Sequence, residues 1–464
     1  MIEATVIFDV GKTNKKILLF DHDGKILSEK LHTLPLTKDD DNFPCEDVHS
    51  LTHWLQSEWN TILKSKDFNI TAVNFTAYGA SFVHLGEDGK PVAPLYDYLK
   101  QIPSALLDKF YDEVKQKTGF NSNQFAQHTC SPKLGMLNSG LQLYWLKNTK
   151  PELWKKIKSS LHLPQYLSYL ITGKKVSDYT SLGCHTALWD FQQVQYSKWL
   201  DDDTLSKLPP ITTQAFTIID FKESSEAIHR YVKVGTGLHD SSSALIPDLQ
   251  SSNNSFILIS TGTWSIQLNP FNHNPLTSDQ LIKDCLCYLK SNGEQVKASR
   301  LLLGKEHDHQ VERIASHFKV NKESITVLAF DEVTSSKTRI ENKTKFYPAC
   351  MEGSGPFSEH QNKSWDVSVF ENANEAYHRL IYDLISMLKV SIQLIDEPEV
   401  ETLFVDGGFA RNVVFLNILS FVFPKKKILA SYLPQSTAMG AFIHLHGLDT
   451  IHENGFEKHF KSII

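Results

Sequence analysis

Residues 6–20 read Val-Ile-Phe-Asp-Val-Gly-Lys-Thr-Asn-Lys-Lys-Ile-Leu-Leu-Phe: an apolar run, a polar turn and a second apolar run. A further turn at 21–24 leads into a third short stretch at 25–27. Apolar β-branched and aromatic residues favour strands, whereas Gly, Asp and Asn mark turns. The segment therefore predicts a three-stranded meander at the start of a sheet.

The same pattern recurs near the middle of the chain. Residues 256–268 again form an apolar run, a turn of small residues and a second apolar run. Residues 72–79 and 403–408 form a second matching pair, because each strand-like run ends in small residues that let a backbone approach a ligand. We therefore predict a duplicated architecture of two related domains, with the boundary in the polar stretch 248–254.

Helical segments lie between these strands. Residues 377–395 form the clearest amphipathic pattern, with Leu380, Leu384 and further apolar residues at four-residue spacing, which is typical of core packing. Residues 141–146 and 154–157 also have helical periodicity. Strands and helices mixed in both halves place the fold in the α/β class.

Length and composition indicate a globular protein. The 464-residue chain exceeds the ~250–300 residues at which one core stops growing. Its formal net charge is −6 with no basic block, so no nucleic-acid partner is expected. Six cysteines without a C-x-x-C pair suit a reducing compartment. With no signal peptide at residues 1–4 and no apolar run of the ~20 residues that span a bilayer, we expect a cytoplasmic protein without a membrane partner.

Several short segments resemble parts of known functional motifs but lack the other residues that those motifs require. Gly11-Lys12-Thr13 resembles the end of a P-loop, but the required earlier glycine is Val6 and a strand follows instead of a helix. The glycines at 235 and 237 lack the third glycine of a dinucleotide fingerprint. Residues 307–309, His-Asp-His, lack a third ligand at metal-binding spacing. No G-x-S-x-G nucleophile turn occurs.

Four segments carry the candidate chemistry: Asp9 at a strand end, residues 261–263, residues 406–408, and Asp240 after a glycine-rich turn. Turns rich in Gly and Thr can present backbone N–H groups to phosphates, and a carboxylate at a strand end suits Mg²⁺. Asp240 also begins a predicted helix. From the residues alone, it is either a helix cap or a catalytic group.

Together these segments resemble the FGGY carbohydrate kinases, which have the duplicated actin/hexokinase/Hsp70-like ATPase fold with two domains flanking a cleft. The resemblance runs from residues 9–13 to residues 437–441; residues 406–412 are similar to the family's adenosine segment and residues 260–265 to its second phosphate segment. It implies an N-terminal sugar-binding domain at 1–248 and a C-terminal nucleotide-binding domain at 249–464.

The resemblance also implies a role for each candidate residue. Asp240 is the expected catalytic base, and Asp9 the expected ligand of Mg²⁺. The residues expected to bind ATP are Gly11, Lys12, Thr13, Thr261, Gly262, Thr263, Gly407, Gly408, Arg411 and Asn412, with Lys12 near the γ-phosphate. Sugar contacts are expected from Tyr78, Ser81, Asp97 and His239.

Within the family, residues 239–244, 261–265 and 78–83 resemble the L-rhamnulose and L-fuculose kinase branch. The chain departs from the family pattern at Ser81 and Thr76, where aspartates are expected, and residues 94–100 lack the usual arginine. The implied activity is ATP- and Mg²⁺-dependent phosphorylation of a terminal hydroxyl of a ketose, most simply a 6-deoxyketohexose.

Two alternatives stay open at the level of sequence. One is a xylulose- or ribulose-type sugar kinase, and the other is a nucleotide-dependent binding module of the same fold with an altered sugar pocket. The sequence leaves the sugar, the hydroxyl that is phosphorylated, the regulation and the oligomeric state, a homodimer included, undetermined.

Overall fold

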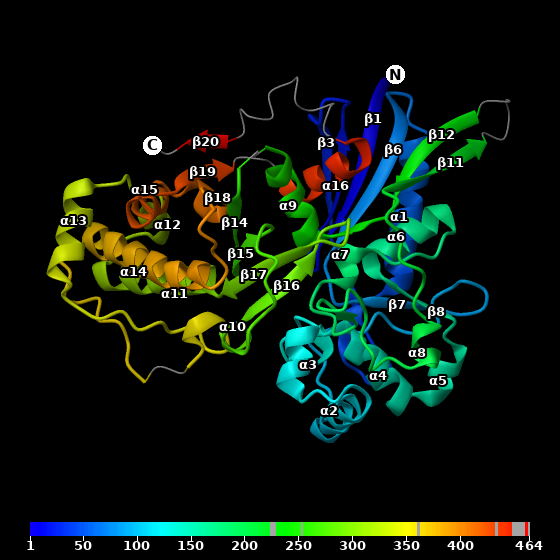
Figure 1. The fold of residues 1–464 in the computed structure, drawn as a ribbon. Coiled ribbons are helices and arrows are strands. Elements are labelled where there is room, and N and C mark those ends of the chain that lie inside the picture. The colour runs from blue at the N-terminus through cyan, green and yellow to red at the C-terminus, as the bar shows by residue number, and fades with distance from the viewer. Residues whose placement is uncertain (223–228, 252–253, 360–361, 432–434, 448–459, 463–464) are drawn as a thin grey trace. The chain divides into compact units, whose positions relative to one another are not determined.

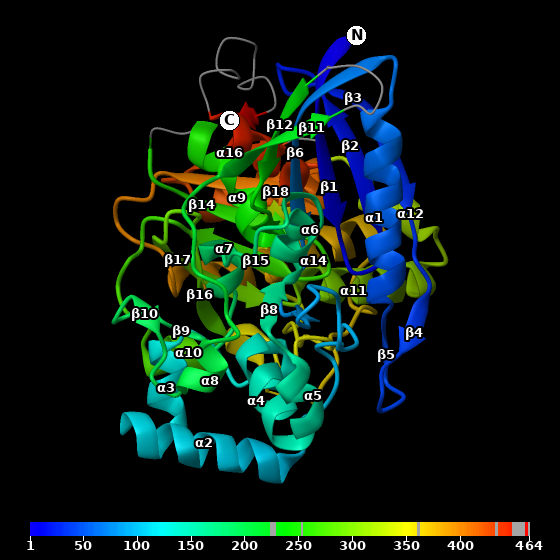
Figure 2. The ribbon, with the colours of Figure 1, turned by 90° about the vertical axis from the view of Figure 1, so that its right-hand side faces the viewer.

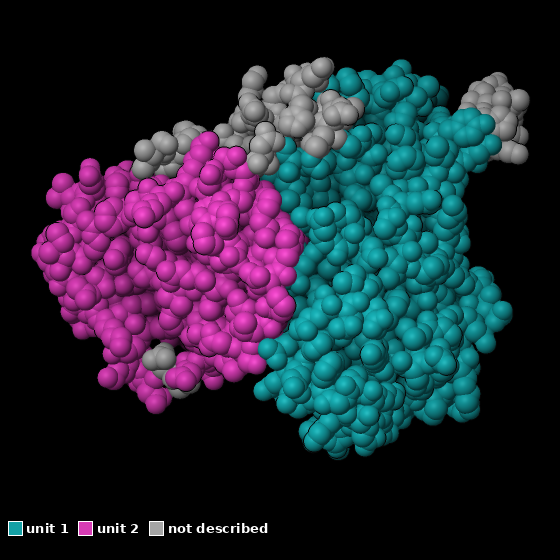
Figure 3. Space-filling view, viewed as in Figure 1, with its two compact units in different colours: residues 1–250, 287–295, 434–455 teal, residues 251–286, 296–433, 456–464 magenta. Residues whose placement is uncertain are grey.

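The computed structural model describes residues 1–222, 229–251, 254–359, 362–431, 435–447 and 460–462 (Figure 1). The chain divides into two compact units (Figure 3). Unit 1 comprises residues 1–250, 287–295 and 434–455, and unit 2 comprises residues 251–286, 296–433 and 456–464. Two short segments from the second half of the sequence therefore belong to unit 1.

Unit 1 is built on a mixed sheet with the strand order β11-β12-β6-β1-β2-β3, and β13 also pairs with β6. Its strands are β1 (Ile2–Val10), β2 (Lys15–Phe20), β3 (Ile26–His32), β6 (Phe68–Ala77), β11 (Phe216–Lys222), β12 (His229–Gly235) and β13 (Leu238–His239). β1, β2 and β3 pair antiparallel, which confirms the predicted meander. β6 runs parallel to β1 and to β13.

Unit 2 contains a second mixed sheet, with the order β16-β17-β15-β14-β18-β19-β20. Its strands are β14 (Phe256–Thr261), β15 (Ser265–Asn269), β16 (Cys285–Leu289), β17 (Gln295–Leu301), β18 (Thr402–Gly407), β19 (Lys427–Ser431) and β20 (Phe460–Ser462). β14 pairs antiparallel with β15, as the repeated sequence pattern predicts, and the structure also pairs β14 parallel with β18.

The two sheets share one topology. The antiparallel series β3-β2-β1 continues into the parallel strands β6 and β12, and the series β17-β15-β14 continues in the same way into β18 and β19. The connection from the antiparallel series to the first parallel strand is helical in both sheets: α1 (Val48–Leu63) precedes β6 in unit 1, and α11 (Leu303–Phe318) to α14 (Ala373–Gln393) lie between β17 and β18 in unit 2. The predicted α/β duplication is therefore confirmed.

Helices cover both sheets. In unit 1 they are α1 (Val48–Leu63), α2 (Ser104–Thr118), α3 (Ser122–His128), α4 (Ser139–Thr149), α5 (Pro151–Lys156), α6 (Leu163–Thr172), α7 (Tyr179–Leu182), α8 (Asp202–Leu205), α9 (Asp240–Ser251) and α16 (Ser436–His446). In unit 2 they are α10 (Ser278–Ile282), α11 (Leu303–Phe318), α12 (Lys322–Thr326), α13 (Glu332–Glu341), α14 (Ala373–Gln393) and α15 (Val413–Val422). Short strand pairs, β4 (Leu36–Lys38) with β5 (Pro44–Glu46), β7 (Phe82–Leu85) with β8 (Ser159–His162), and β9 (Trp189–Asp190) with β10 (Gln195–Tyr196), complete the fold.

Apolar side chains join helices to sheets in both units. In unit 1, α1 lies along the sheet (Figure 2). Its Trp54 packs edge-on against Phe8 of β1. In unit 2, the predicted amphipathic helix is α14, whose Leu380 and Leu384 are fully buried. Asn372 determines where α14 begins, because its side chain accepts from the backbone N–H of Glu375.

Two further observations concern the chain as a whole. None of the six cysteines, all of which the structure describes, forms a disulfide, and five of them are buried. Among the described residues, no helix combines the length and the apolar character that crossing a membrane requires.

Asn74 of β6 holds α16 and the turn after β12 against the sheet of unit 1. Its amide nitrogen donates to the carbonyl of Ala441 (2.8 Å), and its oxygen accepts from the backbone N–H of Gly237 (3.2 Å). Asn74 is completely buried. Removal of this amide would therefore leave the buried N–H of Gly237 without its acceptor and would take away the side-chain donor of the Ala441 carbonyl.

We predict that Asn74→Leu lowers the free energy of unfolding by about 2–5 kcal/mol, because each unsatisfied buried backbone group costs about 1–3 kcal/mol. Urea unfolding followed by circular dichroism measures this difference. Asn69→Leu on the same strand is the control, since Asn69 is only partly buried. Equal stability of the two variants would contradict the structural role of Asn74.

Candidate active site

Asp9 lies near the end of β1, opposite Lys16 of β2 and Thr76 of β6. Within the described residues, no group hydrogen-bonds to its carboxylate. Burial raises the pKa of Asp9 to about 6; Lys16 lowers the pKa, and the carboxylate of Asp240 raises it. Of the two carboxylates that the sequence singled out in unit 1, Asp240 is thus close enough to raise the pKa of Asp9.

Asp240 is the first residue of α9. Its Oδ1 accepts from the backbone N–H of Ser241 (2.6 Å) and from the Ser241 hydroxyl (3.2 Å). A helix-capping side chain instead engages N–H groups two or three residues further on. The side chain exposes 36% of its surface, yet the protein around it raises the pKa of Asp240 to about 6. It is therefore a carboxylate that a small molecule can reach and that titrates near neutrality.

His239 precedes Asp240 and lies beside it. Its Nε2 is 3.2 Å from Asp240 Oδ1 and 3.1 Å from Cys184 Sγ. Burial lowers the pKa of His239 to about 3, so the ring is neutral and its contact with Asp240 is no ion pair. A Cβ at Gly79 would lie 2.8 Å from both His239 Nε2 and Cys184 Sγ, so glycine is required beside the ring.

The turn of residues 11–14 joins β1 to β2, with the Gly11 N–H donating to the Asn14 carbonyl (2.9 Å). Lys12, which the resemblance placed near the γ-phosphate, instead has its Nζ 2.7 Å from Asp97 Oδ2. The same ammonium lies over the rings of Tyr78 and Tyr98, 5.1 and 4.9 Å from their centroids. Thr13, at the same turn, is exposed.

The other expected sugar contacts are buried. Tyr78 donates its phenolic hydrogen to Glu46 Oε2 (2.6 Å), and burial together with this carboxylate holds the pKa of Tyr78 well above its usual value. The hydroxyl of Ser81 contacts the same phenol, and only 2% of Ser81 is exposed. The structure thus brings Asp9, Lys12, Tyr78, Asp97 and the His239–Asp240 pair into one unit.

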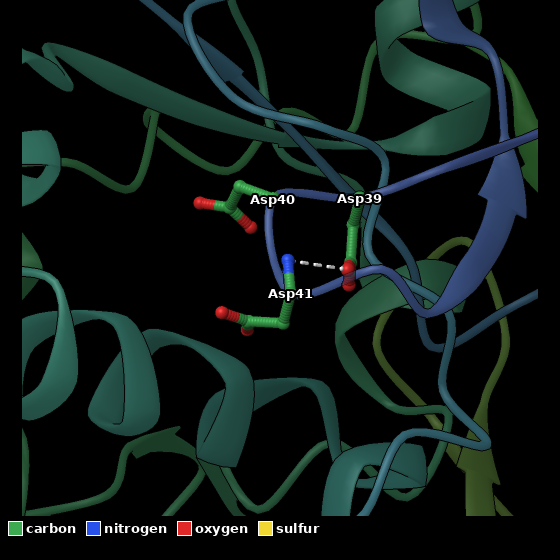
Figure 4. A group of neighbouring side chains, drawn as sticks. All are labelled: Asp39, Asp40 and Asp41. Atoms are coloured by element: carbon green, nitrogen blue, oxygen red, sulfur yellow. Dashed lines mark hydrogen bonds between the residues drawn. The ribbon is translucent and has the colours of Figure 1, made fainter.

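A separate group of carboxylates, Asp39, Asp40 and Asp41, lies in the loop between β4 and β5 (Figure 4). Lys100 pairs with Asp39 and Asp41, and Lys150 pairs with Asp40 and Asp41. Asp39 also accepts from the backbone N–H groups of Asp41 and Phe43. Two lysines therefore balance most of the charge, and the group stabilises the loop.

In unit 2, the Thr261 hydroxyl joins the two glycine-containing turns. It donates to the carbonyl of Asp406 and accepts from the backbone N–H of Phe409 (3.1 Å). Gly407 has φ of +82°, and a Cβ there would lie 1.9 Å from the Thr261 carbonyl oxygen. No other residue fits at this position, which explains the glycine at 407.

A cavity of about 410 Å³ opens beside these turns, within unit 2. It is lined by Thr261, Gly262, Gly304, His307, Asp308, Thr326, Val327, Gly408, Phe409, Arg411 and Asn412. Five of these were expected at the nucleotide site: Thr261, Gly262, Gly408, Arg411 and Asn412. Thr263 and Gly407 flank the cavity in sequence without lining it.

Sequence reasoning missed the contribution of α11 to this cavity. His307 appeared only as part of a rejected metal motif, but its Nε2 lies 3.2 Å from the hydroxyl of Tyr377, which accepts from Asn412 Nδ2 (2.6 Å). Asn412 also caps α15, accepting from the N–H of Phe415. The cavity suits a planar, hydrogen-bonding ligand, because its lining combines the apolar Phe409 and Val327 with the polar Asp308 and Asn412. No local spacing connects α11 to residues a hundred positions away.

Both halves of the chain match models of one protein family. The model described as FGGY family of carbohydrate kinases, N-terminal domain, matches residues 4–247. The model described as carbohydrate kinase FGGY, C-terminal domain, matches residues 253–453. Between them, the two matches span almost the entire chain.

Relatives and solved structures agree with these matches. Rhamnulokinase from Oceanobacillus iheyensis is 21% identical over 459 residues, covering 96% of this chain and 93% of that protein. A carbohydrate kinase structure from Novosphingobium aromaticivorans superimposes with a TM-score of 0.77 at 24% identity, covering 95% of this chain and 93% of that one. A xylulose kinase structure from Lactobacillus acidophilus has a TM-score of 0.75 at 16% identity, covering 99% of this chain and 93% of that one.

The repeated sheet topology and the two family matches lead to one conclusion: the chain belongs to the FGGY family of carbohydrate kinases, with the two-domain actin/hexokinase-like fold, and is a phosphotransferase acting on a sugar.

Proposed function

We propose that this kinase transfers the γ-phosphoryl group of ATP to a terminal hydroxyl of a ketose, a 6-deoxyketohexose such as L-rhamnulose or L-fuculose. The observation that carries the proposal is Asp240, an accessible carboxylate with a pKa of about 6 beside the neutral His239. A base is most effective when its pKa lies near the working pH. The similarity to rhamnulokinase along nearly the full length supports the choice of sugar.

Asp240 orients the sugar hydroxyl and accepts its proton as the new phosphorus–oxygen bond forms. Phosphoryl transfer depends mostly on positioning and charge stabilisation, so one base and a set of fixed donors suffice. The ATP-binding residues proposed in unit 2 are Thr261, Gly262, Thr263, Gly407, Gly408, Arg411 and Asn412. The adenosine moiety occupies the cavity at Gly408, Arg411 and Asn412. In unit 1, Gly11 and Thr13 are also proposed to bind phosphate, because such a turn can offer backbone N–H groups to an anion.

Asp9 fits Mg²⁺, because its carboxylate oxygens have no hydrogen-bond partner among the described residues and carboxylate oxygen is the ligand this ion prefers. Mg²⁺ supplies positive charge that stabilises the phosphate oxygens. Burial raises the pKa of Asp240 to about 6 and so keeps the base near its neutral-pH titration range.

Asp240→Asn tests the base, because the amide keeps the shape but cannot accept the proton. We predict that kcat falls by about 10²–10⁴-fold, while the KM for ATP stays unchanged. Coupled-enzyme detection of ADP measures both. Asp88→Asn, on an exposed loop, is the matched control and keeps full turnover. Near-normal turnover of Asp240→Asn would reduce Asp240 to a structural residue.

The pH profile follows from the same carboxylates. Asp240 must be ionised to accept a proton, so kcat/KM should fall as the pH drops below its pKa of about 6. Asp9 takes up a proton in the same range, which steepens the loss. Initial rates from about pH 5 to pH 8 measure the profile. A rate independent of pH across this interval would contradict the assignment.

Asp9→Ala should raise the Mg²⁺ concentration for half-maximal turnover at least about tenfold, because a carboxylate that holds the ion is lost. A Mg²⁺ titration at saturating ATP and sugar measures the change, with Asp88→Asn again as control. An unaltered titration would remove Asp9 from the metal site.

ADP release in the presence of different sugars tests the substrate. We expect strong release with L-rhamnulose or L-fuculose and little with glycerol. Preference for D-xylulose or L-ribulose would favour a pentulose kinase, the class named for one of the similar folds. No release with any sugar would favour a nucleotide-dependent binding module instead.

A further inference from the structure

The side chain of Lys12 points in a direction that the sequence did not predict. The sequence places it at the tip of the first turn, yet its ammonium points to Asp97 and lies over two tyrosine rings. The lysine side chain is 29% exposed, and Asp97 is 9% exposed. Within the described residues, Asp97 takes one N–H of the ammonium, so two remain for a ligand.

Residues 78 and 79 connect the pair to the proposed base. The Lys12 ammonium lies over the ring of Tyr78, and a Cβ at the next residue, Gly79, would lie 2.8 Å from His239 Nε2. That nitrogen is 3.2 Å from Asp240 Oδ1. The pair and the proposed base therefore lie on either side of residues 78 and 79 in unit 1.

Moving Lys12 to a phosphate would be costly. Asp97 is almost buried, and a buried carboxylate that loses its partner is left as an uncompensated charge, which is strongly destabilising. The Asp97 Oδ1 is already occupied by the backbone N–H of Leu99 (2.8 Å). The ammonium is therefore the main charge compensation available to Asp97.

A second ion pair fixes the turn itself. Lys15, buried to 1% exposure, donates to the carbonyls of Gly11 (3.1 Å) and Lys12 (3.2 Å) and pairs with Glu46. Glu46 in turn accepts from Tyr78, whose ring lies below Lys12. These contacts form a closed ring that holds Lys12 in position from both its backbone and its side chain.

The ring contains two cations and two carboxylates, Lys12 with Asp97 and Lys15 with Glu46, so its formal charge is balanced. An acidic sugar needs an uncompensated cation, which these pairs do not provide. A neutral polyol suits them, because the ammonium donates to one hydroxyl oxygen and the carboxylate accepts from its neighbour.

We propose that Lys12 and Asp97 act as one sugar-binding pair for two adjacent hydroxyl groups of an uncharged sugar, and that Lys12 serves the sugar and not the γ-phosphate. This inference rests on the proposed sugar kinase function and replaces the nucleotide role expected for Lys12. Lys15 and Glu46 are positioning residues for the pair.

Lys12→Met and Lys12→Arg test the proposal in the full-length protein. We expect Lys12→Met to raise the KM for L-rhamnulose or L-fuculose at least about tenfold, as loss of a hydrogen bond to a charged group implies, with the KM for ATP changed by less than about twofold. Lys12→Arg restores part of the affinity. Lys25→Met, at an exposed lysine in the turn before β3, is the control and leaves both values unchanged.

A raised KM for ATP with an unchanged KM for sugar would overturn the proposal. Isothermal titration of each sugar without nucleotide provides a readout that does not depend on turnover. If the wild-type protein releases no ADP with any sugar, the proposed function fails, but loss of sugar binding in Lys12→Met would still support the pair. Equal binding by wild type and Lys12→Met, no sugar binding by the wild type, or preferred binding of D-gluconate would each overturn it.

Discussion

The parallel pairing of β6 with β1 on one side and β13 on the other is the constraint on which the site of unit 1 depends. This register places Asp9 beside Thr76, and Thr76 beside Leu238, so that β13 ends at the same edge of the sheet. Asp240 follows directly and begins α9. Asp240, more than 200 positions from Asp9 in the chain, thereby raises the pKa of Asp9, while burial raises the pKa of Asp240 itself to about 6.

Unit 2 repeats this arrangement for another purpose. The parallel pairing of β14 with β18 brings Thr261 against Gly407, where only a glycine fits, and the threonine hydroxyl joins the two turns. The result is a rigid, glycine-lined edge beside the cavity. The two sheets therefore share one topology but form different sites, because different residues occupy equivalent strand ends. The site in unit 1 contains carboxylates, and the site in unit 2 is lined by backbone and amide groups.

Local sequence patterns were sufficient to predict the helices and strands but not the contacts between side chains far apart in the chain. The meander at residues 6–27, the hairpin at 256–268 and the helix at 377–395 are all present, because alternating or fourfold-spaced apolar residues encode strands and helices directly. No local sequence pattern indicated the pairing of Lys12 with Asp97. It joins residues 85 positions apart, and the same motif position suggested a phosphate ligand. The buried Lys15–Glu46 pair was missed for the same reason, since a lysine in a polar turn is usually exposed.

The sequence by itself determined the class of protein: a duplicated α/β sheet architecture and the glycine- and aspartate-containing turns of a sugar kinase follow from residue order, because these turns need specific residue types at specific strand ends. Only the tertiary structure decided which charges compensate one another, which carboxylates are raised in pKa, and which helix completes the cavity of unit 2. Burial and ion pairing depend on distances across the fold, and these distances are fixed by strand register and packing and not by spacing along the chain.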